Sequence, residues 1–174
     1  INIQGGSNVM TINNIIGDLR APGASVGDAV RGIGIISTTA NSVQKVYYNS
    51  IYLNGSSTGA TFGNSCIYHT ASAISTTSNL DLRNNILINV STPSGTGRIN
   101  VIRRSTSSLN NFSASSNNNL MYAGIPGANR ILYVDGSNEL QTLMDYQAHV
   151  VPRETNSVTE NPPFISTAGV SGSF

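Results

Sequence analysis

A short asparagine-containing segment recurs about every 35 residues along this chain, and this repeat constrains the fold more than any other feature. In each copy an asparagine is followed two places later by isoleucine or leucine. The aligned asparagines are Asn13, Asn49, Asn84 and Asn118. One unit of this length cannot bury its own apolar side chains, so successive units must stack on one another. The spacing therefore predicts a solenoid in which each repeat forms one coil.

Each period also contains two further apolar runs, so that three short strands fit into every repeat. One run lies between the asparagine copies, at 33–36, 66–69, 99–102 and 131–134. The other precedes each asparagine, at 9–12, 43–48, 80–83 and 109–112. We therefore predict an all-β fold, a right-handed parallel β-helix solenoid of about four coils with three short strands each. A β-sandwich is the alternative, but its turns recur roughly every 8–12 residues without a longer shared register.

The repeated asparagine has a physical role at the corner of a coil. Asparagine tolerates the left-handed backbone conformation, and its side-chain amide bonds to the turn or to the next asparagine in a stack. We predict that Asn13, Asn49, Asn84 and Asn118 form a structural ladder along one corner of the solenoid. On these residues the chain resembles the right-handed β-helices of the pectin-lyase-like superfamily, of the kind found in large bacterial secreted or surface proteins. The resemblance covers about residues 1–135, and it implies three parallel sheets but no particular chemistry.

The pattern changes after residue 135. Capping residues at 137–139 precede an apolar helical face, which predicts a short C-terminal capping helix of roughly ten residues. That face consists of Leu140, Leu143, Met144 and Gln147. The Asn-Ser-Val and Asn-Pro-Pro-Phe-Ile sequences that follow are similar to the tail that closes β-helix regions in large bacterial secreted proteins. We assign the coils to 1–135, the capping helix and closing segment to 136–168, and a linker or frayed end to 169–174.

Composition and charge argue against several kinds of partner. Charged residues make up only 10% of the chain and the net charge is +1, so nothing favours nucleic acid or an anionic membrane surface. No apolar run reaches the roughly 20 residues that a membrane span needs. Asn, Ser and Thr supply roughly a third of the chain, which gives a neutral, hydrated surface. We expect an extracellular or cell-surface location for a solenoid of this composition.

The chain offers few groups for catalysis, and we predict no catalytic residue, no cofactor and no metal site. A glycoside hydrolase needs two carboxylates close together, and a lyase needs carboxylates for Ca²⁺ beside a basic residue. No acidic pair emerges from the predicted register of the eight acids, Asp18, Asp28, Asp81, Asp135, Asp145, Glu139, Glu154 and Glu160. The two histidines, His69 and His149, have no partner at ligand spacing. The single cysteine, Cys66, fits a small core residue better than a nucleophile.

Five basic and aromatic residues are candidates for contact with a glycan: Arg83, Arg103, Arg104, Tyr52 and Tyr68. Arginine binds carboxylates and sulfates, and tyrosine stacks on sugar rings. The competing interpretation is that the arginines are solvated at coil edges, where charge discourages edge-to-edge association. In that case the tyrosines pack at the margin of the core.

Two functions remain open from the sequence. The first is a non-catalytic extracellular structural or adhesive module, such as a stalk, surface or fibre segment, with weak binding to a glycan. The alternative is a fragment of a polysaccharide lyase or glycoside hydrolase that acts on an extracellular polysaccharide. Two acids, or an acid and an arginine, converging in one groove would favour that alternative. The open first coil adds a further expectation, end-to-end self-association or stacking against further coils of a longer parent chain.

Overall fold

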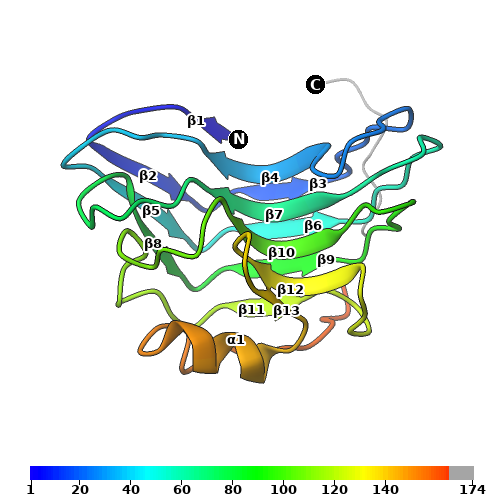
Figure 1. The fold of residues 1–174 in the computed structure, drawn as a ribbon. Coiled ribbons are helices and arrows are strands. Elements are labelled where there is room, and N and C mark those ends of the chain that lie inside the picture. Colours follow the sequence, from blue (N-terminus) through cyan, green and yellow to red (C-terminus); the bar gives the residue numbers. More distant parts are fainter. Residues whose placement is uncertain (165–174) are drawn as a thin grey trace.

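The computed structural model describes residues 1–164, which wind into stacked coils that form a β-solenoid of about four turns (Figure 1). Each strand of a coil pairs in parallel with the equivalent strand of the next coil, so that three parallel sheets run along the solenoid. The predicted fold class is confirmed. The predicted linker at 169–174 and the last part of the predicted closing segment, 165–168, lie outside the described residues.

The three sheets follow the period found in the sequence. Sheet A contains β1 (Asn2–Ile3), β4 (Val30–Ile35), β7 (Asn64–His69), β10 (Ile99–Arg104) and β12 (Arg130–Val134), and ends with the antiparallel β13 (Glu139–Leu140). Sheet B contains β2 (Asn8–Ile12), β5 (Val43–Tyr47) and β8 (Asn79–Arg83). Sheet C contains β3 (Ile15–Gly17), β6 (Ser50–Leu53), β9 (Ile86–Asn89) and β11 (Leu120–Tyr122).

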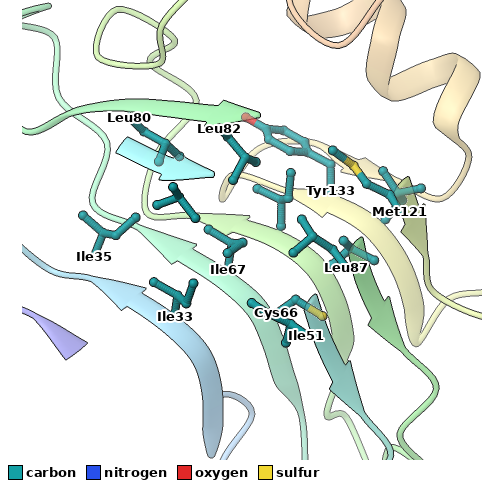
Figure 2. Close-up of a cluster of buried hydrophobic side chains, with 14 of the residues drawn as sticks. Ile33, Ile35, Ile51, Cys66, Ile67, Leu80, Leu82, Leu87, Met121 and Tyr133 are labelled. Carbon is teal, nitrogen blue, oxygen red and sulfur yellow. The ribbon is translucent and has the colours of Figure 1, made fainter. Parts of the chain in front are cut away.

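The inward side chains of the three sheets form one apolar core along the solenoid axis (Figure 2). In sheet A, the parallel register stacks four fully buried side chains in one column, Ile33, Ile67, Ile102 and Tyr133. Leu82 of sheet B and Leu87 of sheet C are equally buried. The apolar runs of the sequence are therefore the core, because equivalent residues one coil apart lie directly above one another.

Glycine allows the loops between sheet C and sheet A to stack closely. A Cβ atom added at Gly63 would lie 2.3 Å from the carbonyl oxygen of Arg98, and one at Gly97 would lie 1.9 Å from that of Phe62. Both distances are far shorter than a van der Waals contact, so only glycine fits at these positions. The stacking of coils thus extends beyond the sheets into the loops.

The fourth coil departs from the prediction, because the run at 109–112 is not a strand. Only two isolated bridges continue sheet B there, Leu80 with Phe112 and Arg83 with Asn117. The bridged residues are three positions apart in β8 and five positions apart in the fourth coil. The two extra residues form a turn instead of pairing, and they interrupt the strand.

The predicted asparagine ladder is present, but three of its four members are the residues that follow those predicted. The ladder consists of Asn14, Asn49, Asn85 and Asn119. Each side-chain amide donates to the Oδ1 atom of the next member, at 2.9, 3.0 and 2.9 Å along the series. Each backbone N–H donates to the same Oδ1 atom, at 3.1, 2.9 and 2.9 Å. Every Oδ1 atom inside the ladder therefore accepts two hydrogen bonds.

The predicted residues Asn13, Asn84 and Asn118 have a different role from the ladder. Their φ angles are 56°, 55° and 60°, and Tyr48, with a φ angle of 55°, holds the same position in the second coil. The predicted column was wrong at these three positions because it aligned Asn49 with the first member of each Asn-Asn pair. The second coil has Tyr-Asn in place of Asn-Asn, so Asn49 corresponds to the second member. In each coil, the first of these two residues turns the backbone, and the second carries the side-chain amide of the ladder.

The predicted capping helix is confirmed as α1 (Leu143–Val150), but it begins later than expected. Leu140 was expected on the helix and lies instead in β13, which pairs antiparallel with β12. Two features favour this hairpin. Gly136 has a φ angle of 86°, and the Asp135 carboxylate accepts two backbone N–H groups of the turn. The hairpin closes the end of sheet A.

The buried face of α1 also differs from the expected one. Thr142 caps the helix by accepting the N–H of Asp145 at 3.2 Å. With this start, Tyr146 and Val150 face the core and are fully buried. Met144 was expected on the same face as the core residues and is 75% exposed.

The corrected ladder predicts that neighbouring asparagines differ sharply in their contribution to stability. Asn85→Ala should lower the free energy of unfolding by roughly 2–5 kcal/mol, because it leaves buried donors of Asn49 and buried carbonyls without partners. Asn84→Ala should cost roughly 1 kcal/mol, since alanine only tolerates the left-handed backbone less well. Urea unfolding of both variants measures the difference. An equal or larger loss in Asn84→Ala contradicts the assignment.

Candidate functional site

The outer face of sheet A gathers charged and aromatic side chains from successive coils. The parallel register places Gly34, Tyr68, Arg103 and Val134 in one column. Tyr68 and Arg103 are partly exposed there, whereas their neighbours in sequence point into the core. We define the sheet A face by the residues that meet along this column: Asp28, Arg31, Tyr68, Arg98, Arg103 and Glu139.

Asp28, in the loop before β4, organises one end of the sheet A face. Its carboxylate pairs with Arg31 at 2.6 Å and lies 3.9 Å from the Nε atom of Arg103. Its other oxygen accepts the hydroxyl of Ser65 at 3.1 Å. The guanidinium of Arg31 is stacked over the Tyr68 ring, 3.7 Å from the ring centroid. The ring and two arginines from three successive coils are thus held together around a single carboxylate.

A hollow of about 260 Å³ lies at the other end of the sheet A face. Its lining includes Tyr68, Arg98, Arg103 and Glu139. Arg98 forms an ion pair with Glu139, which the hairpin of β12 and β13 carries to this position. Three arginines and two acids make up the face, so one positive charge is in excess.

Two of the five predicted glycan contacts lie elsewhere on the surface. Arg83, at the end of β8, binds the Asp81 carboxylate through two nitrogens, at 2.7 Å each. Tyr52 belongs to sheet C and packs edge-to-face against Phe164, with 5.3 Å between the ring centroids. Tyr52 and Tyr68 are therefore on different sheets and cannot form one stacking platform.

Arg104 was predicted as a glycan contact but its side chain is inside the solenoid. It follows Arg103 in β10 and points to the opposite side of the sheet, where the residue is only 2% exposed. Its guanidinium donates to the carbonyl oxygen of Ser108 at 2.7 Å and to Oδ1 of Asn111 at 2.8 Å. Burial lowers the pKa of this guanidinium. Tyr68 and Arg103 are thus the two predicted contacts that the structure brings together.

The sequence held a weak signal for the residues that were missed. Asp28 and Arg31 are three positions apart with opposite charges, immediately before an apolar run. That pair could have been assigned to the same site as Tyr68 and Arg103 once the register was fixed. Glu139 could not have been assigned to this site from the sequence. It reaches Arg98 only through the hairpin that replaced the first turn of the expected helix.

His69 and the single cysteine, Cys66, are both buried inside the solenoid. His69 is fully buried beside the carbonyl oxygen of Ser78, at 2.9 Å, and burial lowers its pKa to about 3. Cys66 is buried in the core, and burial raises the pKa of its thiol.

Within residues 1–164, no three His, Cys, Asp or Glu side chains gather as metal ligands would. No helix in the described part of the chain is long and apolar enough to cross a membrane.

Glu154 is an acid buried at the end of the asparagine ladder. Its Oε2 atom accepts hydrogen bonds from the Asn119 amide at 2.9 Å and from the Ser157 hydroxyl at 2.5 Å. Burial raises the pKa of the carboxyl to about 7, although these two hydrogen bonds favour its charged form. Its Oε1 atom is buried without a partner among the described residues.

Comparisons of the chain with protein-family models, with curated proteins and with solved structures find no match. The function of this protein therefore has to be inferred from the geometry of its own residues.

Glu154 should make stability depend on pH between its two pKa values. Because the folded pKa of about 7 exceeds the ordinary value of 4.5, the folded chain binds the proton more tightly than the unfolded chain. The stabilisation that comes from this tighter proton binding is fully present below about pH 4.5 and is lost as the pH rises through about 7. The free energy of unfolding of Glu154→Gln, relative to that of the natural chain, should therefore rise by roughly 2–4 kcal/mol across this window. Thermal unfolding from pH 4 to pH 8 measures the difference, and a constant difference would contradict it.

Proposed function

We propose that this protein is a rigid, non-catalytic structural module of an extracellular surface, which makes weak contact with an acidic glycan through the sheet A face. The observation that carries the proposal is the column in which Tyr68 lies beside Arg103, above a hollow with an excess positive charge. We also propose kinship with the pectin-lyase-like superfamily, on the three parallel sheets and the asparagine ladder.

The architecture supports a structural role. The coils are joined by parallel sheets, by the buried ladder and by closely stacked loops, so the solenoid resists bending. Its surface is neutral and rich in Asn, Ser and Thr side chains, which hydrate well without attracting ions. A rigid rod of this kind suits many weak contacts in parallel with a polymer or a surface.

Arg103 is the residue best placed to bind an anionic group of a glycan. Arg31 is already paired with Asp28, and Arg98 with Glu139. Arg103 lies 3.9 Å from Asp28, a loose ion pair, and its side chain is 37% exposed. A carboxylate or sulfate could therefore form two parallel hydrogen bonds with its guanidinium. The hollow of about 260 Å³ is smaller than typical ligand pockets of roughly 300–1,000 Å³, which is consistent with weak binding.

Binding to acidic glycans should depend on Arg103 and weaken with salt. Arg103→Ala should reduce the affinity for polyuronates or sulfated glycans about tenfold, the loss of one charge-assisted contact. Arg20→Ala is the matched control, because Arg20 is an exposed arginine paired with Asp18 outside the sheet A face. A glycan array followed by calorimetry of the positive hits measures both variants. An equal loss of affinity in the two variants, or binding to neutral glycans only, would contradict the proposal.

A fragment of a polysaccharide lyase or glycoside hydrolase is the second candidate. One specific observation favours it, the convergence of an acid, Asp28, with Arg31 and Arg103 on the sheet A face. A polysaccharide-degradation screen with and without Ca²⁺ separates the two candidates. A non-catalytic module predicts no new chain ends with any polymer. Cleavage that Asp28→Asn abolishes, while the fold persists, would establish the second candidate in its place.

A further inference from the structure

The outer side of sheet C carries a column of large uncharged side chains. The parallel register places Tyr52, Ile88 and Tyr122 in this column, in the second, third and fourth coils. Leu87 and Met121, which alternate with them along the strands, point into the core. The column therefore faces outward. We define the sheet C face by its three residues, Tyr52, Ile88 and Tyr122.

A short segment of the chain crosses the sheet C face. We define the strap as residues 159–164. It follows Val158, which pairs with Leu120 and so lies one level beyond the fourth coil. It reaches the second coil, where the Phe164 ring packs edge-to-face on Tyr52, with 5.3 Å between the ring centroids. The strap therefore passes the fourth and third coils and runs along the solenoid axis.

The length of the strap fits an extended polyproline II conformation. Val158 and Phe164 lie three levels apart, about 14 Å at about 4.8 Å per coil. Six residues in the polyproline II conformation span about 19 Å, and Pro162-Pro163 favours that conformation. Ile88 faces outward in the third coil and is nevertheless fully buried, which fits a position under the strap.

The strap is held on the sheet C face by side-chain contact alone. A chain that runs across parallel strands cannot pair with them, because their N–H and C=O groups already bond to neighbouring strands. Among the described residues the strap forms one hydrogen bond, from the N–H of Phe164 to the carbonyl oxygen of Pro162 at 2.9 Å. The Phe164 side chain is still 37% exposed. A segment with better side-chain contacts could therefore displace the strap.

The strap uses only one of the two tyrosines. A polyproline II helix presents the same side every three residues, about 9.3 Å. Tyr52 and Tyr122 lie two coils apart, about 9.6 Å, so one such helix can place a side chain on each. With Phe164 on Tyr52, the residue three positions earlier is Asn161, which is exposed. Among the described residues, no aromatic ring packs on Tyr122.

An apolar hollow beside Tyr122 can take the side chain that the strap lacks. Its volume is about 240 Å³, and its mostly apolar lining includes Tyr122, Leu132, Leu143 and Thr159. A large apolar side chain is stabilised by burial in such a hollow. The amide of Asn161 would lose its hydration there without gaining a partner.

We propose that the sheet C face binds an extended, proline-containing segment of a partner protein, which displaces the strap. The segment carries two large apolar side chains three positions apart, one on Tyr52 and the other in the hollow beside Tyr122. Aromatic side chains recognise proline-rich segments in this way because the polyproline II conformation is already formed before binding. This inference goes beyond the proposed function and does not depend on glycan binding.

The strap of a second copy is a weaker candidate for the same surface. It has the same sequence as the strap already in place, which is tethered at Val158. A short tether gives an effective concentration of about millimolar, so an identical free segment does not compete at ordinary protein concentrations. The displacing segment has to carry the apolar side chain that Asn161 does not supply.

The experiment measures the binding of synthetic peptides to the full chain by NMR titration. One peptide has the strap sequence, Thr-Glu-Asn-Pro-Pro-Phe, and the second is Thr-Glu-Phe-Pro-Pro-Phe. We expect the second peptide to bind about tenfold more tightly, because it buries one more aromatic ring. Its binding should also remove the cross-peaks between the rings of Phe164 and Tyr52. A third peptide, Thr-Glu-Phe-Ala-Ala-Phe, should bind more weakly than the second, since it lacks the prolines.

Three variants of the full chain assign the contacts. Phe164→Ala weakens the strap and should raise the affinity for the first two peptides by the same factor, about tenfold. Tyr122→Ala should abolish the difference between these two peptides. Tyr48→Asn is the matched control, because Tyr48 is exposed outside the sheet C face and the equivalent positions of the other coils have asparagine. It should leave both affinities unchanged.

Four outcomes would overturn the proposal. Equal affinity of the unmodified chain for the first two peptides would show that the hollow beside Tyr122 takes no side chain, and this comparison needs no variant. Failure of both peptides to bind Phe164→Ala would show that the sheet C face is no binding surface. Equal affinity for the second and third peptides would exclude recognition of the polyproline II conformation. Dimers of the unmodified chain that Phe164→Ala abolishes, seen by sedimentation velocity, would assign the surface to a second copy instead.

Discussion

Buried hydrogen bonds between successive asparagines fix the register of every coil on the next. Parallel strand pairing alone permits a slip, and a slip of one residue would turn each core side chain to the opposite face. Asn49, Asn85 and Asn119 prevent this, because the Oδ1 atom of each accepts both the backbone N–H and the side-chain amide of the ladder asparagine in the coil before it. A displaced coil would leave these groups buried without partners, at a cost of roughly 1–3 kcal/mol each. The core columns and the outer columns follow from that register.

The same register creates the sheet A face. Coils lie about 4.8 Å apart, so Tyr68 and Arg103 meet although 35 positions separate them in the sequence. The next residue along, Arg104, is taken into the interior by the alternation of the strand. One arginine thus meets solvent and its neighbour is bound to internal carbonyl and amide oxygens. The candidate contact surface and the buried core therefore both follow from one periodic pattern.

The period, the three strands of the first three coils and the closing helix could be predicted because apolar runs at a fixed spacing have few stable arrangements. The ladder was misplaced by one residue at Asn13, Asn84 and Asn118 because two asparagines in succession look equivalent until backbone angles separate them. Of the predicted glycan contacts, Tyr68 and Arg103 come together, whereas the alternation of the strand turns the side chain of Arg104 into the interior. The Arg98–Glu139 pair depends on a hairpin whose turn includes Ser137 and Asn138, which the sequence pattern had indicated as helix capping residues.

Exchange of the side-chain amide protons of asparagine, followed by NMR, tests the ladder most directly. If Asn49, Asn85 and Asn119 hold the coils in register, their side-chain amide protons should exchange at least about a thousandfold more slowly than those of Asn13, Asn84 and Asn118. They should also share one opening free energy, because the coils depend on one another. Rapid exchange of Asn85, or protection of Asn84 in its place, would contradict the account.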